Sequence, residues 1–215
     1  MITPTTEPFF FPGNKIGCLL THGFTGAPKE MRWMGEYLAE QGFSVLGVRL
    51  AGHATNPDEM IRTRYIDWIH SVEDGYHLLK GVADRVVLVG LSMGGALSLL
   101  MASKLDVAGV FAMSTPYRLT DPRIKFAKIF SPFVKYMPKS GNEPGSGWLD
   151  KESWEDHISY PKNPVRSAVE IAALLDEMRA TLPKVKVPTL LVHSRNDSYV
   201  PPSSMENIYS ALGTS

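Results

Sequence analysis

The stretch Gly90-Leu91-Ser92-Met93-Gly94 has the pattern G-x-S-x-G and joins two segments of different character. An apolar run, residues 85–89, precedes it, and a helical pattern, residues 96–104, follows it. Where a strand turns sharply into a helix at such a motif, the central serine stands above the sheet as a nucleophile. The flanking glycines let the backbone approach closely at the turn. The stretch therefore predicts a catalytic serine at Ser92; the alternative is a helix N-terminus that Ser92 caps.

The composition is typical of a single folded domain with a sizeable core. The chain has 215 residues, 44% of them hydrophobic, and 22 basic residues balance 22 acidic ones. A net charge of zero gives no attraction to nucleic acid or to an anionic membrane surface. The N-terminus lacks a signal-peptide pattern, and no apolar run reaches transmembrane length. The chain has one cysteine, Cys18, so it cannot form an intramolecular disulfide, and we expect this side chain to be buried. Because a low cysteine content is compatible with a reducing compartment, we expect a cytoplasmic protein.

Strands and helices alternate along most of the chain, which favours a mostly parallel sheet with helices on both faces. The predicted strands are residues 16–21, 43–50, 85–89, 107–114 and 187–193. The predicted helices are residues 28–41, 65–81 and 96–104, with a further short helix within 197–212. The apolar face of the first helix is expected to consist of Met31, Trp33, Met34 and Leu38.

Residues 116–183 interrupt this alternation, because they contain no clear strand and are too long for a simple connection. Two parts of this segment, residues 123–136 and 165–182, are expected to be helical, and residues 138–147 are expected to form a mobile loop. The segment is rich in large apolar residues, namely Phe126, Ile129, Phe130, Phe133, Val134, Tyr136, Met137, Trp148 and Trp154. We interpret residues 116–183, the cap segment, as an insertion over a ligand pocket; the alternative is ordinary packing of surface helices.

Acyl transfer through a serine needs a base, an acid that orients the base, and two N–H groups that stabilise the oxyanion. The N–H of Met93, the residue after the nucleophile, is one expected donor. The second should come from the loop after the first buried strand, which is His22-Gly23-Phe24-Thr25-Gly26, and Phe24 N–H is the natural choice. His22 precedes the serine, so we interpret it as fixing this loop rather than as the base.

The expected acid is Asp197, just past the end of the predicted strand 187–193, where loops of parallel sheets present catalytic groups. The alternative is that Asp197 only begins a turn. Chain order then requires a histidine after the acid, but none follows it. The six histidines are His22, His53, His70, His77, His157 and His193. We expect structural roles for His53 and His193, solvent exposure for His70 and His77, and a place in the cap segment for His157.

Together these motifs resemble the α/β-hydrolase superfamily, and within it the small bacterial carboxylesterases and monoacylglycerol lipases. The matching pieces follow the family's order along nearly the whole chain; they are residues 19–26, 49–53, Asp67-Trp68, residues 90–95, and Asp197 with residues 200–202. The resemblance implies an α/β-hydrolase fold and a catalytic histidine about thirty residues past the acid. This sequence contains no histidine after Asp197. We therefore expect that the strand, the loop with the histidine and the helix that end the family's fold are missing from these 215 residues.

The resemblance implies a serine hydrolase that cleaves carboxylic esters of short or medium acyl chains, monoacylglycerols among them. We expect Ser92 as nucleophile, Asp197 as acid, and an oxyanion hole formed by Phe24 and Met93, with no metal and no cofactor. Without the histidine, the 215 residues alone are expected to be inactive, and the exposed sheet edge is expected to favour self-association. Two alternatives remain: a non-catalytic binding protein of this fold, and a thioesterase or acyltransferase with the same residues.

Overall fold

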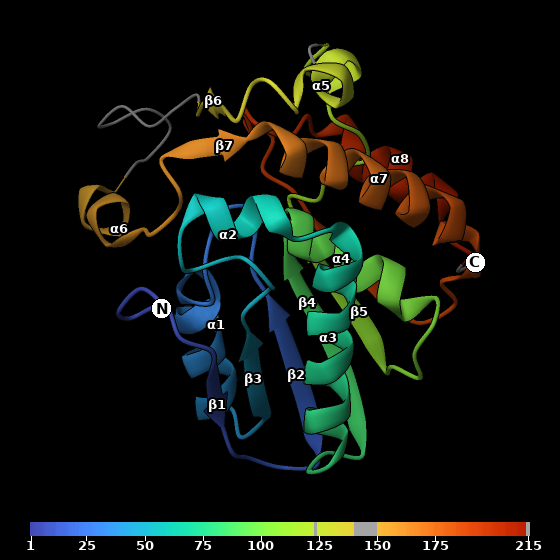
Figure 1. Ribbon diagram of the computed structural model, residues 1–215. Coiled ribbons are helices and arrows are strands. Elements are labelled where there is room, and N and C mark those ends of the chain that lie inside the picture. Colours follow the sequence, from blue (N-terminus) through green and yellow to red (C-terminus); the bar gives the residue numbers. More distant parts are fainter. Residues whose placement is uncertain (123, 140–149, 214–215) are drawn as a thin grey trace.

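The computed structural model describes residues 1–122, 124–139 and 150–213, and Figure 1 shows one central sheet surrounded by helices. The sheet has six strands in the order β1-β3-β2-β4-β5-β8. Only β1, at one edge, runs antiparallel to its neighbour. The strands are β1 (Phe9–Phe11), β2 (Ile16–Thr21), β3 (Ser44–Val48), β4 (Arg85–Leu91), β5 (Gly109–Met113) and β8 (Thr189–Val192). The predicted mostly parallel sheet is confirmed.

Helices cover both faces of the sheet. They are α1 (Lys29–Glu40), α2 (Pro57–Arg62), α3 (Tyr65–Lys80), α4 (Met93–Ala102), α5 (Ile124–Phe130), α6 (Lys151–Asp156), α7 (Val165–Thr181), the 3-10 helix η1 (Leu182–Lys184) and α8 (Ser203–Ala211). Successive residues of a strand point to opposite faces. Leu19 and Leu88 therefore pack toward α3, α4 and α7, whereas Leu20 and Val89 pack toward α1. Between these two layers of helices, the carboxyl ends of the parallel strands meet at the same edge of the sheet.

Among the short elements that the sequence missed are β1, α2 and α6. For α2 the local signals were present, since Asn56 accepts a hydrogen bond from Glu59 N–H at 3.0 Å and Pro57 occupies the first helical position. For α6 the cap is Asp150, whose side chain accepts from the N–H groups of Glu152 and Ser153. Each helix has only six residues, which is too short for its periodicity to be recognised.

The cap segment differs from its prediction. The helix expected over residues 123–136 ends at Phe130, because Pro132 disfavours helical backbone at the residue before it. Two short strands, β6 (Tyr136–Pro138) and β7 (Lys162–Pro164), pair antiparallel above α2 (Figure 1). The prediction that this segment contains no strand is therefore wrong. Residues 140–147 of the predicted loop, and Trp148, lie outside the described residues.

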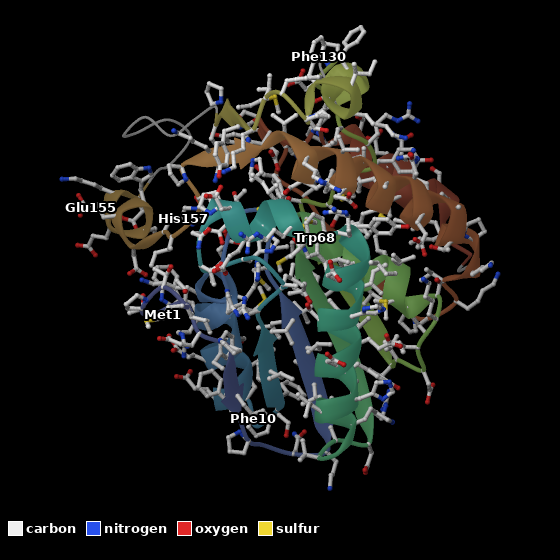
Figure 2. The ribbon with its side chains drawn as sticks, viewed as in Figure 1. Met1, Phe10, Trp68, Phe130, Glu155 and His157 are labelled. Atoms are coloured by element: carbon white, nitrogen blue, oxygen red, sulfur yellow. The ribbon has the colours of Figure 1, made fainter. Side chains whose placement is uncertain are left out.

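Several large apolar side chains lie on the surface instead of in the core or the pocket. Trp33, expected on the buried face of α1, is 64% exposed, while Met31 on the same helix is 2% exposed. Phe133 is 85% exposed and Phe130 is 53% exposed. Figure 2 shows Phe130 pointing away from the body of the protein. The expectation that Trp33 packs into the core is wrong, because three-to-four spacing does not say where a helix meets the sheet.

The face of the sheet that carries α1 becomes more exposed toward the β8 edge. The pairing register places Val89, Phe111 and Leu190 in one row across β4, β5 and β8. Along this row Val89 is 3% exposed, Phe111 is half-buried and Leu190 is 58% exposed. Val192, in the next row, is 46% exposed. Parallel sheets are normally covered on both faces, so this apolar corner is a surface to which a further segment can bind.

Of the helices in the described part of the chain, none is long and apolar enough to cross a membrane.

Candidate active site

Ser92 lies at a sharp turn between the end of β4 and the start of α4. Its backbone has φ 55° and ψ −116°, a conformation that side chains rarely adopt. The turn is packed so closely that a Cβ on Gly90 would lie 2.2 Å from Gly94 O, and a Cβ on Gly94 would lie 2.1 Å from Thr21 O. The Ser92 side chain makes no helix-capping hydrogen bond. The alternative of a simple capping serine is therefore wrong.

We expect Ser92→Gly to stabilise the fold while removing the side chain that is expected to act as nucleophile. A strained non-glycine residue costs about 1–3 kcal/mol, and glycine releases this strain but loses part of the gain to its unfolded-state entropy. The free energy of unfolding in urea should rise by about 1 kcal/mol relative to Ser92→Ala, which keeps the same strain. Equal stability of the two variants would mean that the backbone at position 92 carries no strain that glycine can release.

A cavity of about 330 Å³ opens beside Ser92. The three residues expected to form the nucleophile and oxyanion hole, Ser92, Met93 and Phe24, all line it. Met93 is the first residue of α4, and the first N–H groups of a helix have no acceptor within the helix. The rest of the lining comes from the cap segment and from the loop near Asp197. The cap residues are Pro116, Arg118, Leu119, Thr120, Asp121, Ile124, Met137, Asn163, Ala168 and Ile171, and the loop residues are Tyr199, Val200 and Pro201.

The lining of this cavity corrects one expectation about the cap segment. The large apolar residues of the cap segment were expected to cover a pocket, but two of them, Phe130 and Phe133, do not line this cavity. Met137 and Ile171 contribute instead. Met137 belongs to β6 and Ile171 to α7, and only the three-dimensional packing of these elements brings them together.

His22 fixes the loop after β2 through hydrogen bonds of both its ring nitrogens. Leu50 N–H donates to His22 Nε2 at 3.2 Å, so the proton is on Nδ1, which donates to Gly23 O at 2.9 Å. Burial lowers the pKa of His22 to about 4, and the ring stays neutral. Both ring nitrogens are thus used within the fold, in agreement with the structural role expected for His22. His53 is also buried, with Nδ1 at 3.1 Å from Ala51 O.

The carboxylate of Asp197 shapes the loop that follows β8. Its Oδ1 accepts the N–H groups of Tyr199 at 2.9 Å and Val200 at 2.8 Å. Its Oδ2 lies 3.4 Å from Nε2 of the buried His193, and the same Nε2 is 2.9 Å from Val200 O. The Asp197 side chain is 13% exposed. The turn expected as the alternative role therefore exists, and the same carboxylate stands next to three residues of the Ser92 cavity.

None of the six histidines, all of which are described, lines the Ser92 cavity. His70 and His77 are exposed on α3, as expected. His157 follows α6 and faces Glu30, with His157 Nε2 3.9 Å from Glu30 Oε1. Glu30 is a residue that the sequence analysis missed. An acidic residue in the first turn of a helix, just after the loop that follows β2, was the signal that could have drawn attention to it.

The sheet order, the strained serine between β4 and α4, and the acid after β8 define an α/β-hydrolase fold. A solved structure of a metagenome-derived lipolytic enzyme, from work on LipS and LipT, superposes with a TM-score of 0.91 at 31% identity, covering 100% of this chain and 86% of that one. The family described as serine aminopeptidase, S33 matches residues 14–215, and the chain belongs to this family.

Two curated relatives are also similar over nearly the whole chain. A thermostable monoacylglycerol lipase from Bacillus sp. (strain H-257) is 32% identical over 97% of this chain and 81% of its own length. A carboxylesterase from Bacillus subtilis (strain 168) is 28% identical over 98% of this chain and 83% of its own length. The monoacylglycerol lipase of Paleococcus ferrophilus, at 16% identity and a TM-score of 0.80, shares the fold.

Proposed function

We propose that this protein hydrolyses carboxylic esters through an acyl-enzyme on Ser92. The observation that carries the proposal is the strained serine, which stands at the start of a helix and lines a cavity together with Met93 and Phe24. In the first step Ser92 Oγ attacks the ester carbonyl, and the N–H groups of Phe24 and Met93 stabilise the oxyanion. The alcohol then leaves, and water releases the acid from Ser92. The ester-cleaving relatives support this reaction class.

We propose Asp197 as the acid that orients the base. Two backbone N–H groups hold Oδ1 in place, and each carboxylate oxygen has two lone pairs. Oδ2 can therefore accept a hydrogen bond from an imidazole N–H while His193 stays beside it. A serine hydroxyl is a weak nucleophile at neutral pH, so such an imidazole is required.

We propose that the base is a histidine of a further segment, which binds against the exposed apolar corner of β5 and β8. Leu190 and Val192 are exposed there, and β8 is the edge strand of the sheet in the described part of the chain, so its backbone can pair with another strand. The two curated relatives are longer than this chain, which supports such a segment. A second candidate function follows if no such segment exists: the absence of a histidine along the Ser92 cavity then favours a binding protein that has this fold but does not catalyse.

One comparison distinguishes these possibilities. The 215-residue chain and the product of the gene's full reading frame are assayed with 4-nitrophenyl butyrate, a thioester and an amino-acid 4-nitroanilide. We expect no turnover of the 215-residue chain. We expect ester hydrolysis by the full product if its frame supplies a histidine. Hydrolysis of only the thioester or the anilide would replace the ester assignment with a thioesterase or a peptidase. Rapid ester hydrolysis by the 215 residues alone would refute the external base.

The 215-residue chain is expected to self-associate through the same corner. An uncovered sheet edge with apolar side chains favours pairing between copies. Replacing both Leu190 and Val192 by lysine should shift the sedimentation coefficient toward that of a monomer. A matched control replaces Tyr37 and Leu78, which are exposed on α1 and α3, by lysine and should change nothing. If the wild-type chain is already monomeric at high concentration, the corner does not drive association.

We propose short or medium acyl chains as the acid part of the substrate, with monoacylglycerols among the esters. A volume of about 330 Å³ stands at the lower end of the range for small-molecule pockets. Most of the cap residues along the cavity are apolar, so the acyl chain is expected to contact these rather than the polar Arg118, Thr120 and Asp121.

Met137→Ala is expected to shift acyl preference toward longer chains. The shorter side chain enlarges the cavity, and each methylene in an apolar site is worth roughly 1–3 kcal/mol, or about 10-fold or more in relative rate. The ratio of rates for octanoate and butyrate esters should rise accordingly in an active preparation. Phe133→Ala, which removes an exposed ring of the same segment, is the control and should leave the ratio unchanged. Identical profiles for both variants would exclude Met137 as a specificity residue.

A further inference from the structure

A largely buried carboxyl group, on a side chain that is 11% exposed, lies against the oxyanion loop, residues 22–26. Glu30, in the first turn of α1, accepts Gly23 N–H on Oε2 at 2.9 Å. A Cβ on Gly26 would lie only 2.0 Å from Glu30 Oε1, so the loop wraps around the carboxyl group with no side chain between them. A Cβ on Gly23 would lie 3.6 Å from Ser92 Cβ. The same Cβ position would lie 3.4 Å from Glu30 Oε2, so Glu30 and Ser92 both lie beside Gly23 of this short loop.

The cap segment also contacts this loop, at Thr25. Lys139 Nζ donates to Thr25 Oγ1 at 3.2 Å and to Ser159 Oγ at 2.7 Å, and Tyr160 N–H donates to Thr25 O at 2.9 Å. Thr25 has φ 61°, an unfavourable conformation for a β-branched residue. The two hydrogen bonds from Lys139 and Tyr160 hold Thr25 in that conformation, and the bond to Ser159 fixes Lys139 in place. The residues Lys139, Ser159 and Tyr160 are called the cap latch below.

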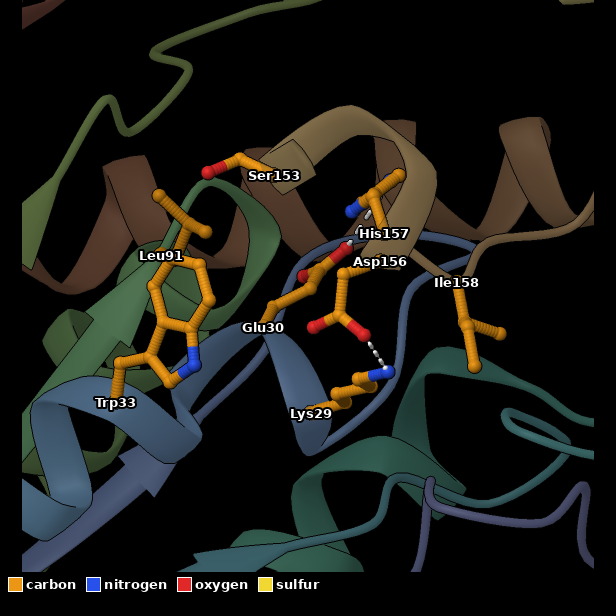
Figure 3. Close-up of a pocket in the computed structure, with 8 residues that line it drawn as sticks. All are labelled: Lys29, Glu30, Trp33, Leu91, Ser153, Asp156, His157 and Ile158. Carbon is orange, nitrogen blue, oxygen red and sulfur yellow. Dashed lines mark hydrogen bonds and ion pairs between the residues drawn. The ribbon is translucent and has the colours of Figure 1, made fainter. Parts of the chain in front are cut away.

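Glu30 also faces charged groups from the cap segment. Figure 3 shows the side chains of Glu30 and His157 pointing toward one another across a pocket, beside the ion pair of Lys29 and Asp156. Burial raises the pKa of Glu30 to about 7, although the Gly23 N–H and the charge of Lys139 both lower it. Burial lowers the pKa of Lys139 and of His157. The carboxyl group therefore changes its charge near neutral pH while it holds the loop.

We propose that Glu30 is a positioning residue, whose carboxylate and the cap latch together hold the oxyanion loop so that Phe24 N–H faces Ser92. This role rests on the ester-hydrolase function proposed above. A carboxylate is a stronger acceptor than a carboxylic acid. The Gly23 bond therefore strengthens as the pH rises through about 7, and weakens below it, when Glu30 takes up a proton.

The first test observes the Gly23 amide directly in the 215-residue chain, by nitrogen-15 NMR across the neutral pH range. We expect the Gly23 resonance to titrate with a midpoint near 7 and to stop titrating in Glu30→Gln. Glu36→Gln, an exposed position on the same helix, should titrate as the wild type does. Lys139→Met should move the midpoint upward, because Lys139 favours the carboxylate. A Gly23 resonance that is insensitive to pH, or that titrates equally in Glu30→Gln, would overturn the proposal.

The second test measures ester hydrolysis by the product of the full reading frame. Glu30→Gln should lower kcat roughly tenfold near pH 8 with little change in KM, because the misplaced donor acts mainly in the transition state. The ratio of wild-type to variant rates should approach one near pH 6, where Glu30 is itself protonated. Taking this ratio cancels the titration of the catalytic base. A pH-independent ratio would indicate a merely structural Glu30. If the wild type is inactive, the proposed function fails, while the NMR result still decides the role of Glu30.

Discussion

Ser92→Ala is expected to reduce hydrolysis of 4-nitrophenyl butyrate by the active form of the protein on the order of 10⁶-fold, close to background. The physical reason is that no other hydroxyl is held at the turn between β4 and α4. Alanine keeps the same backbone strain, so the variant should fold and retain the cavity. Whatever acceleration remains would come from binding and from the N–H groups of Phe24 and Met93.

Ser103→Ala is the matched control for this experiment. Ser103 ends the same helix, and its hydroxyl donates to Leu100 O at 2.7 Å, well away from the cavity. The rate of ester hydrolysis by Ser103→Ala should stay within about twofold of the wild-type rate. If Ser92→Ala turned over the ester at the rate of Ser103→Ala, the serine at the turn would not be the nucleophile.

The second large effect is expected for Asp197→Asn, which should lower kcat by about 10⁴-fold. The amide oxygen can still accept the N–H groups of Tyr199 and Val200, so the loop should keep its shape. It cannot, however, stabilise a positively charged imidazole, and its NH2 group favours the wrong tautomer of the base. Stopped-flow measurement of acyl-enzyme formation would locate the loss in the chemical step.

Asp84→Asn, an exposed carboxyl just before β4, is the control for the removal of one negative charge. A rate for Asp197→Asn near that of the wild type would mean that another carboxylate orients the base. Asp121, which lines the Ser92 cavity, would then be the next carboxylate to replace.

The sequence predicted best what short-range patterns determine. β2 was predicted with its actual bounds, because a buried strand of a parallel sheet is apolar on both faces and needs no partner to be recognised. The turn at Ser92 was predicted because its glycines and serine are adjacent in the chain. α4 nevertheless starts at Met93, before the predicted residue 96, since the motif itself forms the first turn.

What the sequence did not predict depends on contacts between distant segments. β6 and β7 have only three residues each and exist because they pair with one another. Phe130 looked like a pocket residue from its hydrophobicity alone, but its position on the outer surface follows from how α5 packs on α7. Glu30 looked like an ordinary charge on the first turn of α1. Its burial became visible only when the oxyanion loop and His157 were placed around it.

The central claim is that Ser92 attacks a carbonyl with the help of a histidine that lies outside these 215 residues. The most direct measurement is mass spectrometry after incubation with a fluorophosphonate, applied to the 215-residue chain and to the product of the full reading frame. We predict one label per molecule on the peptide that contains Ser92 in the full product, no label in its Ser92→Ala variant, and no label on the 215-residue chain. Stoichiometric labelling of a purified chain with an intact mass near 23.8 kDa, or labelling at any other residue, would contradict this account.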